Sequence, residues 1–208
     1  MRCSSEETLK AVHLAAPIIQ GGEGPCMSKS EPDYHVATLK RYMSQDDVPF
    51  DAANELLIEH ARLMHRRMIE GGGPDFDIML HINGFWKKFD QVMPPVGSYY
   101  LAWSNDGRLI GTGALRTVSP GVGEMKHLYV RPEARGMRLG QALVEARIAD
   151  ARAMGLKTLV ADTFAANSEM PALYDKIGFE RVEPSSAGST AGISPELVEH
   201  MLFFKMEL

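Results

Sequence analysis

Apolar residues recur along much of the chain with the period of an amphipathic α-helix. This pattern predicts helices over residues 52–69, 76–92 and 139–154, and a shorter one that contains Tyr174. The first two are separated by a Gly-Gly-Gly-Pro sequence that begins at Gly71, and Gly155 caps the third. Met and aromatic residues on the apolar sides of these helices are therefore expected in the protein core.

Shorter segments with alternating or continuous apolar residues have the pattern of β-strands. They lie at residues 34–41, 98–103, 108–118, 124–130, 156–163, 179–183 and 200–207. Asn105-Asp106-Gly107 predicts a hairpin turn between the second and third strands, and a Ser- and Gly-rich stretch at 185–198 predicts a long loop. A hairpin followed by strand, helix, strand, helix and two strands predicts an α+β fold with a mixed sheet.

Composition and charge restrict the class of protein. With 208 residues, 45% hydrophobic and 24% charged, the chain has the composition of a soluble protein with a single globular domain, which we assign to residues 33–208. A net charge of −5 argues against nucleic acid as a partner. The two cysteines, Cys3 and Cys26, provide no disulfide framework, which fits a cytoplasmic protein. The scattered histidines predict no metal site.

Residues 1–32 are expected to form a poorly ordered N-terminal extension. Their apolar run, at residues 9–19, is interrupted by Lys10, His13 and Pro17. The run is too short to span a membrane and too broken for the core of a signal peptide. We therefore expect no membrane partner, and the pattern leaves open whether the chain forms a homodimer.

A loop rich in Gly and Arg connects the strand at 124–130 to the helix at 139–154. Glycine lets backbone N–H groups approach an anion closely, and a helix N-terminus directs unpaired donors and its positive dipole end toward that anion. Arg135 and Arg138 add guanidinium groups whose geometry suits phosphate oxygens. The loop therefore indicates a phosphate site, although the same composition also occurs in an ordinary basic connector.

Three separate motifs in this region resemble the GNAT superfamily of acyl-CoA-dependent N-acetyltransferases. Residues 135–140, Arg-Gly-Met-Arg-Leu-Gly, resemble the family motif Arg/Gln-x-x-Gly-x-Gly/Ala, with Arg138 in place of the first motif Gly. Asn167 follows the next strand, and Leu-Tyr-Asp-Lys-Ile-Gly-Phe at 173–179 resembles Leu/Phe-Tyr-x-x-x-Gly-Phe. The resemblance covers residues 98–183 well and the preceding part of the domain in outline.

The resemblance implies a GNAT-type mixed central sheet of about six to seven strands flanked by about four helices. It also implies acetyl-CoA as co-substrate and no metal. The loop arginines and nearby N–H groups would hold the pyrophosphate, and a backbone N–H of a splayed strand would face the thioester oxygen. The implied cofactor contacts are Leu128, Tyr129, Val130, Arg135, Gly136, Met137, Arg138, Leu139, Gly140, Gln141 and Asn167. As a loop residue, Asn167 could equally cap a helix.

Acyl transfer to an amine needs a neutral amine and a proton for the departing thiolate. A Lys-like amine, whose reference pKa is about 10.4, must first lose a proton at neutral pH. The resemblance implies Glu124 as the base, as in some branches of the family where a glutamate acts through water, and Tyr174 as the general acid. Alternatively, Glu124 is a solvent-exposed carboxylate near the start of a strand with no catalytic role, and Tyr174 is a tyrosine that only packs within a helix.

In this family the acceptor contacts the loop between the first two helices and the loop between the last two strands, here residues 70–77 and 185–199. Glu70, Asp75 and Asp77 make the first loop acidic, which would favour a cationic amine; solvated loop charges are the alternative. We expect acetyl transfer from acetyl-CoA to a primary amine of a small molecule or peptide. The attack would be direct, because no Cys or Ser nucleophile stands beside a plausible base. A catalytically silent acyl-CoA-binding regulatory module is the second hypothesis.

Overall fold

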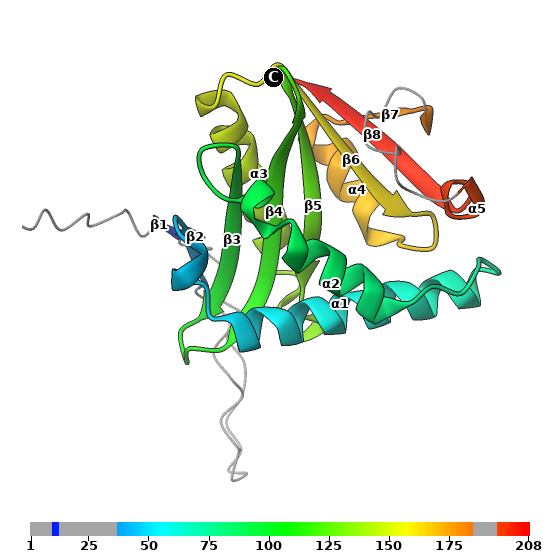
Figure 1. Cartoon of the computed structure of the whole chain (residues 1–208), viewed down its shortest axis with the longest axis horizontal. Coiled ribbons are helices and arrows are strands. Elements are labelled where there is room, and N and C mark those ends of the chain that lie inside the picture. The colour runs from blue at the N-terminus through cyan, green and yellow to red at the C-terminus, as the bar shows by residue number, and fades with distance from the viewer. Residues whose placement is uncertain (1–9, 13–36, 185–194) are drawn as a thin grey trace, which may run out of the picture.

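A mixed β-sheet forms the centre of the protein in the computed structural model, which describes residues 10–12, 37–184 and 195–208. Within these residues the sheet has eight strands in the order β1-β2-β3-β4-β5-β6-β8-β7. Figure 1 shows α1 and α2 on one face of the sheet and α3 and α4 on the other. The predicted α+β fold class with a mixed central sheet is confirmed.

The strands are β1 (Lys10–Val12), β2 (Ala37–Tyr42), β3 (Gly97–Ser104), β4 (Leu109–Ser119), β5 (Val122–Val130), β6 (Thr158–Phe164), β7 (Glu180–Val182) and β8 (Met201–Glu207). The α-helices are α1 (Phe50–Glu70), α2 (Ile78–Lys87), α3 (Leu139–Ala153), α4 (Glu169–Ile177) and α5 (Pro195–Val198). Three short 3₁₀ helices are η1 (Gln45–Asp47), η2 (Phe89–Val92) and η3 (Pro132–Ala134).

Three predicted segments differ from the structure in part. The helix expected over residues 76–92 is divided, because α2 ends at Lys87 and η2 follows it as a separate 3₁₀ turn. The loop expected over residues 185–198 ends in α5, and its residues 185–194 lie outside the described part of the chain. Of the predicted N-terminal extension, residues 10–12 form β1, which pairs antiparallel with β2, and the rest lies outside the described residues.

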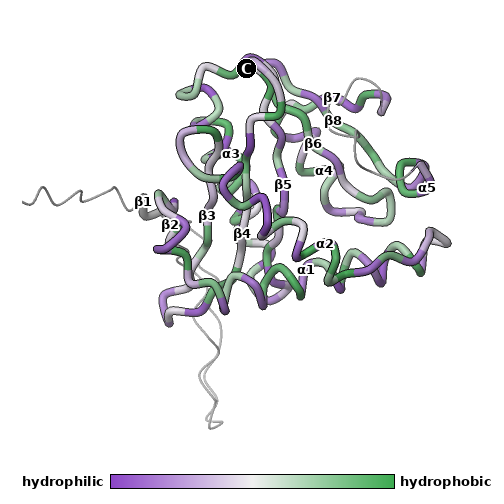
Figure 2. The backbone as a smooth tube through the Cα atoms, viewed as in Figure 1, coloured by the Kyte–Doolittle hydropathy of each residue, from purple (hydrophilic) through white to green (hydrophobic). Residues whose placement is uncertain are grey.

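The helix α1 follows the apolar periodicity read from the sequence. Its buried side chains recur every three or four residues and pack against the sheet and α2, and they are Ala53, Leu56, Leu57, Ala61, Met64 and Met68. Figure 2 shows the resulting alternation of hydrophobic and hydrophilic residues along this helix. The helix ends at Gly71, whose backbone N–H donates to the carbonyl oxygens of Arg67 and Ile69. The stripe of small and medium apolar residues therefore fixes which side of α1 lies on β4 and β5.

The strands β5 and β6 separate part-way along their length. Their parallel pairing covers only Val122–Met125 with Thr158–Ala161, the first halves of the two strands. Beyond Met125, β5 also carries a bulge, in which His127 and Leu128 stand opposite the single residue Gly113 of β4. The backbone of His127 adopts a left-handed conformation with φ of +52°. Together, the bulge and the lost pairing open the sheet in its middle.

A buried arginine supports the bulge from the α3 side. The Arg147 side chain has no exposed surface, and it donates hydrogen bonds to the carbonyl oxygens of Leu143, Ala114 and Lys126 at 2.9, 2.9 and 3.3 Å. Burial lowers the pKa of Arg147 to about 10. Gly113 makes room for the guanidinium group, since a Cβ atom at this position would lie 3.0 Å from it. The backbone geometry at the opening thus depends on a side chain from the opposite face of the sheet.

Two glycine substitutions should change stability in opposite directions. A Cβ atom at Gly97 would lie 2.7 Å from Cα of Val92 and closer still to two backbone carbonyl oxygens, so Gly97→Ala should destabilise the fold by about 1–3 kcal/mol. Gly84 lies exposed within α2 with open space around it, so Gly84→Ala should stabilise by roughly 0.5–1 kcal/mol. Urea unfolding of both variants measures the two changes, and a tolerated alanine at position 97 would contradict the close approach of Gln91 and Val92 in η2 to Gly97.

Candidate functional site

A cavity of about 400 Å³ lies where β5 departs from β6, and its walls come from α1, β5, the loop after β5, the start of α3, and α4. Ten of the eleven cofactor-binding residues predicted from the sequence line it; Met137 does not. The ten are Leu128, Tyr129, Val130, Arg135, Gly136, Arg138, Leu139, Gly140, Gln141 and Asn167. The structure therefore brings the predicted cofactor residues together, and their roles remain predictions.

The Gly- and Arg-rich loop enters α3 through two left-handed residues. Gly136 has φ of +81°, and Arg138, at the N-cap position of α3, has φ of +58°. This conformation costs a non-glycine residue roughly 1–2 kcal/mol, which explains why a glycine is the usual motif residue where this chain carries Arg138. The first N–H groups of α3 have no acceptor within the helix and carry its positive dipole end. This end of the cavity is therefore suited to an anion.

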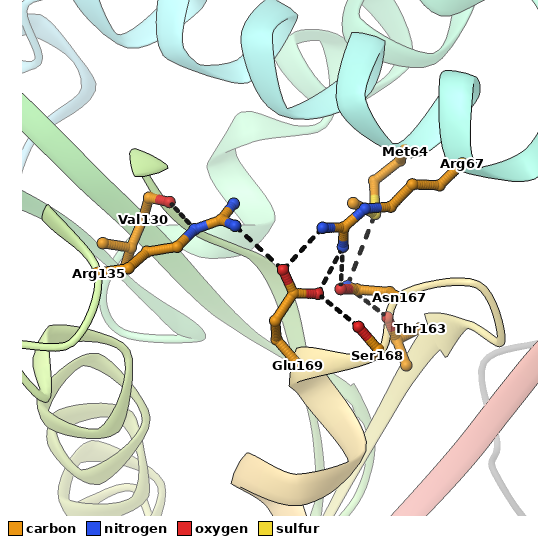
Figure 3. A network of polar contacts seen from close by, with 8 residues as sticks. All are labelled: Met64, Arg67, Val130, Arg135, Thr163, Asn167, Ser168 and Glu169. Atoms are coloured by element: carbon orange, nitrogen blue, oxygen red, sulfur yellow. Dashed lines mark hydrogen bonds and ion pairs between the residues drawn. The ribbon is translucent and has the colours of Figure 1, made fainter. Parts of the chain in front are cut away.

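A network of charged side chains crosses the cavity (Figure 3). The Glu169 carboxylate, at the start of α4, accepts hydrogen bonds from both terminal nitrogens of Arg67 at 2.7 Å and from Arg135 at 3.0 Å. Arg67 extends from α1, and Arg135 lies in the loop after β5. Hydrogen bonds from Arg67 and the charges of both arginines lower the pKa of Glu169 to about 2. The carboxylate thus holds two cations that face the cavity.

Asn167 belongs to the same network and does not cap α4. Its Oδ1 accepts a hydrogen bond from Arg67 at 2.6 Å, and its Nδ2 donates to Oγ1 of Thr163 at 3.0 Å. The N-cap of α4 is Ser168. The helix-cap interpretation of Asn167 is therefore wrong, and a contact with the cofactor stays a prediction for this nearly buried side chain.

Glu124, the predicted base, is fully buried and does not line the cavity. Its carboxylate lies 2.6 Å from Nε of Arg116 and 2.9 Å from Nζ of Lys126. Lys126 also contacts the carboxylate of Asp162 at 2.6 Å, so the four side chains form a charged cluster across β4, β5 and β6. The alternative of a solvent-exposed carboxylate is wrong, and the catalytic role stays a prediction.

Tyr174, the predicted general acid, is 2% exposed and packs between the rings of Phe179 and Phe204 at centroid distances of 4.9 and 5.0 Å. Burial raises the pKa of its hydroxyl to about 12. Its neighbour Leu173 lines the cavity, whereas Tyr174 does not. The tyrosine is therefore a packed helix residue that holds its proton at neutral pH, and its role as an acid stays a prediction.

The acidic residues between α1 and α2 bind local partners. The Asp75 carboxylate lies 2.6 Å from Nε2 of His65, and Asp77 caps α2 by accepting a hydrogen bond from the Leu80 backbone at 2.9 Å. Neither these two nor the exposed Glu70 lines the cavity. The structure therefore favours solvated loop charges over an acidic acceptor site. In the other predicted acceptor loop, residues 185–194 lie outside the described chain.

Sequence reasoning missed several residues of the cavity. The helical period predicted that Met64 is buried in the core, and it could not predict that Met64 also lines the cavity. Arg67 was missed because it lies on the polar side of the same helix. Glu169 follows the Asn167 motif by two residues, which is a local signal that could have been used. The cavity residues from outside the predicted set are His60, Leu63, Met64, Arg67, Ala134, Glu169, Met170, Leu173 and Lys176.

Comparison with known proteins gives a consistent result. The sequence model of the Acetyltransferase (GNAT) family matches residues 67–179. An uncharacterized N-acetyltransferase of Schizosaccharomyces pombe is 38% identical over 92 residues, which cover 44% of this chain and 56% of that protein. The chain thus spans about half the length of the curated relatives that it matches first.

Solved structures share the fold. An acetyltransferase from Streptococcus agalactiae has a TM-score of 0.64 at 20% identity, over 83% of this chain and 98% of that one. A GNAT family acetyltransferase from Elizabethkingia anophelis, solved with acetyl-CoA bound, has a TM-score of 0.52 at 21% identity, over 83% and 98% of the two chains. At sequence identities of 20% and 21%, the similarity shows a shared fold.

Two features are absent from residues 10–12, 37–184 and 195–208. No helix in this part of the chain is long and apolar enough to cross a membrane. The same residues contain no group of three or more His, Cys, Asp or Glu side chains placed to hold a metal ion.

The ion pairs of Glu169 should make a small, pH-dependent contribution to stability. Its pKa is depressed from 4.5 to about 2, so the contribution is present above pH 4.5 and is lost as the pH falls toward 2. Because the side chain is 46% exposed, Glu169→Gln should cost less than about 1 kcal/mol at pH 7, and nothing near pH 2. Urea unfolding between pH 2 and 7 measures this difference. Glu180→Gln, which changes an exposed residue of β7, should show no such trend.

Proposed function

Because this chain belongs to the acetyltransferase (GNAT) family, we propose that it transfers an acetyl group from acetyl-CoA to a primary amine. The observation that carries the proposal is the cavity at the opening between β5 and β6, with a cationic loop and a helix N-terminus at one end. This geometry would suit an elongated anion beside the part of β5 that has no pairing with β6.

The loop after β5 would bind the pyrophosphate of acetyl-CoA. Four cationic side chains line the cavity against the single carboxylate of Glu169, and they are Arg67, Arg135, Arg138 and Lys176. Arg135 would exchange Glu169 for a phosphate oxygen, which forms charge-assisted hydrogen bonds of the same kind. The N–H groups at residues 136–141 would add neutral donors.

The second half of β5 would hold the pantetheine arm. From Lys126 onward this strand has no pairing with β6, so its backbone groups on that side can bind the amides of the cofactor. Leu128, Tyr129 and Val130 line the cavity along this edge. A backbone N–H at the bulge would then face the thioester oxygen and stabilise the negative charge that develops on it.

The transfer would proceed by direct attack of the amine on the thioester carbon. The nitrogen–carbon bond forms, the carbon–sulfur bond breaks with its electron pair on sulfur, and the amine loses one proton. Tyr174 would protonate the thiolate, since its raised pKa keeps the proton available at neutral pH. Glu124 is the base expected from the sequence. It would act through water, because its carboxylate is buried between Arg116 and Lys126.

A catalytically silent acyl-CoA-binding module is the second candidate. One observation favours it: neither Glu124 nor Tyr174 lines the cavity that collects the cofactor residues. A module of this kind would bind the cofactor with the same loop and release no thiol. Turnover separates the two functions, whereas cofactor binding is common to both.

Cofactor binding should stabilise the fold and depend on Arg135. Acetyl-CoA at a hundred times its Kd should raise the free energy of unfolding by about 2.7 kcal/mol. Arg135→Ala should weaken acetyl-CoA binding roughly ten- to a hundredfold, because one charge-assisted contact contributes about 1.5–3 kcal/mol. The same change should leave a phosphate-free acetyl thioester unaffected.

Isothermal titration with both ligands measures these affinities. Arg152→Ala is the matched control, since Arg152 is an exposed cation of α3 that does not line the cavity. If Arg135→Ala lowers the affinity for both ligands equally, the residue has only a packing role. Absence of any rise in melting temperature with millimolar acetyl-CoA would remove the basis of the proposed function.

The proton-transfer residues should affect turnover far more than cofactor affinity. Tyr174→Phe and Glu124→Gln keep the shape of each side chain, and each should lower kcat about 10²–10⁴-fold in a free-thiol release assay. With an alkylamine acceptor, the Glu124 variant should recover at high pH, where more of that amine is neutral; with an amine that is already neutral at pH 7, no such recovery is expected. Full turnover of Glu124→Gln at neutral pH would leave this residue as the counter-ion of Arg116 and Lys126. Absence of turnover in the parent protein with every amine would favour the silent module.

A further inference from the structure

A continuous row of six aromatic rings runs along the α1 and α2 side of the opening. Successive ring centroids lie 5.8, 6.4, 5.7, 6.4 and 5.1 Å apart. The six residues, in order, are Phe164, Phe76, His81, His127, His60 and Tyr129. They come from β6, the segment before α2, α2, β5, α1 and β5. The row is therefore a product of the tertiary fold and crosses the gap between β5 and β6.

One end of the row lies in the cavity, since His60 and Tyr129 both line it. The other end is open to solvent to different degrees: His81 is exposed, and Phe76 and Phe164 are half-buried. At the centre, the strained backbone of His127 directs its ring toward α2, where it lies 4.3 Å from the ring of Phe85. An aromatic surface thus leads from solvent to the bulge where the thioester would lie.

The electrostatic surroundings of the three histidines disfavour an additional positive charge. Burial, His81 and Arg67 lower the pKa of His60 to about 4, and burial and the neighbouring histidines lower that of His127 well below its usual value. Desolvation of its imidazole by surrounding side chains and the charge of Lys126 also lower the pKa of His81, although part of the residue reaches solvent. The charged side chains that act on these histidines are the cations Arg67, Arg116 and Lys126 and the carboxylate of Asp162. Glu124 is paired with Arg116 and Lys126, and Asp162 with Lys126. Beside Phe76, the imidazole of His65 lies 2.6 Å from the carboxylate of Asp75.

We propose that this row is the acceptor subsite, and that it selects a primary amine attached directly to a flat aromatic or heteroaromatic ring and therefore uncharged at neutral pH. This inference rests on the proposed function, whose acceptor class it names. The aromatic body would lie against the rings of Phe76, His81 and His127. Its nitrogen would reach the thioester from the side opposite the pyrophosphate loop.

An uncharged amine simplifies the reaction at this site. Its lone pair is available without prior loss of a proton, so the nitrogen can attack the acetyl carbon as it arrives. The carbon–sulfur bond then breaks with its electron pair on sulfur, and one amine proton ends on the departing thiol. An alkylammonium ion would bind weakly in its charged form, because the cluster disfavours positive charge, and the free-energy cost of losing its proton at neutral pH would lower its kcat/KM.

Three amines of similar size test the proposed class by free-thiol release with acetyl-CoA at pH 7. Aniline is uncharged, benzylamine is a cation with an aromatic ring, and cyclohexylmethylamine is a cation without one. We expect kcat/KM to be highest for aniline, lower for benzylamine and lowest for cyclohexylmethylamine. Equal or better use of cyclohexylmethylamine would overturn the inference while leaving the proposed acetyltransferase function in place.

Substitutions within the row should act on the acceptor alone. Phe76→Ala and His81→Ala should each lower kcat/KM for aniline about three- to tenfold, because each removes one aromatic contact. Affinity for acetyl-CoA should not change. His81→Phe, which restores a ring without a titratable group, should recover most of the loss. The matched controls are Phe50→Ala and Leu80→Ala, which remove exposed apolar side chains of α1 and α2 outside the row.

Binding separates this inference from a failure of the proposed function. If no amine is acetylated, titration of aniline into the CoA-loaded protein still tests the subsite directly. Saturable binding that is weakened in Phe76→Ala and His81→Ala and unchanged in the two controls would support the row as a ligand site. Absence of aniline binding would overturn it. Variants that lose stability without any change in amine preference would also overturn it, because the rings would then serve only to pack α2 on the sheet.

Discussion

The incomplete pairing of β5 with β6 is the constraint on which the site depends. Pairing stops at Met125, and the bulge formed by His127 and Leu128 turns the strand away from its neighbour. Such a break exposes backbone N–H and C=O groups that ordinarily bind a partner strand, and these groups need another partner. A cofactor with amide groups is a suitable one. Arg147 keeps the break in place by binding the carbonyl oxygens of both β4 and β5, so a helix on the far face determines the shape of the site.

The charge distribution gives the two ends of the opening different chemistry. The loop end contains the N–H groups at the start of α3 and several arginines. There, the carboxylate of Glu169 accepts hydrogen bonds from Arg67 and Arg135. That carboxylate orients the arginines, and it can be exchanged for a phosphate oxygen at little electrostatic cost, because one anion replaces another. At the α2 end, the cations Arg116 and Lys126 are paired with the carboxylates of Glu124 and Asp162. Burial lowers the pKa values of the imidazoles of His60 and His127, which disfavours their charged forms. This difference underlies our proposal that the first end binds a polyanion and the second a neutral, flat molecule.

Local patterns in the sequence predicted much of the fold. The apolar period of α1 is confirmed by the burial of Leu57, Ala61, Met64 and Met68, since amphipathicity alone selects the buried side. The Asn-Asp-Gly turn is confirmed by Gly107, whose φ is +79°. The predicted helix over residues 76–92 was too long, because apolar residues continue through η2 although the backbone tightens after Lys87. Periodicity records which residues are buried and does not distinguish an α-helix from a 3₁₀ turn that follows it.

By itself, the sequence determined the α+β class and predicted an anion site in the loop at 131–141, because short motifs of this kind fix local backbone geometry. It also identified ten of the residues that line the cavity, since these residues lie in or next to such motifs. Only the tertiary structure decided the surroundings of Glu124, which is buried between Arg116 and Lys126. It likewise decided the contact of Arg67 with Glu169, 102 residues away, and the order of the aromatic rings. These features join side chains from separate elements, and no local pattern encodes the distance at which a fold will place them.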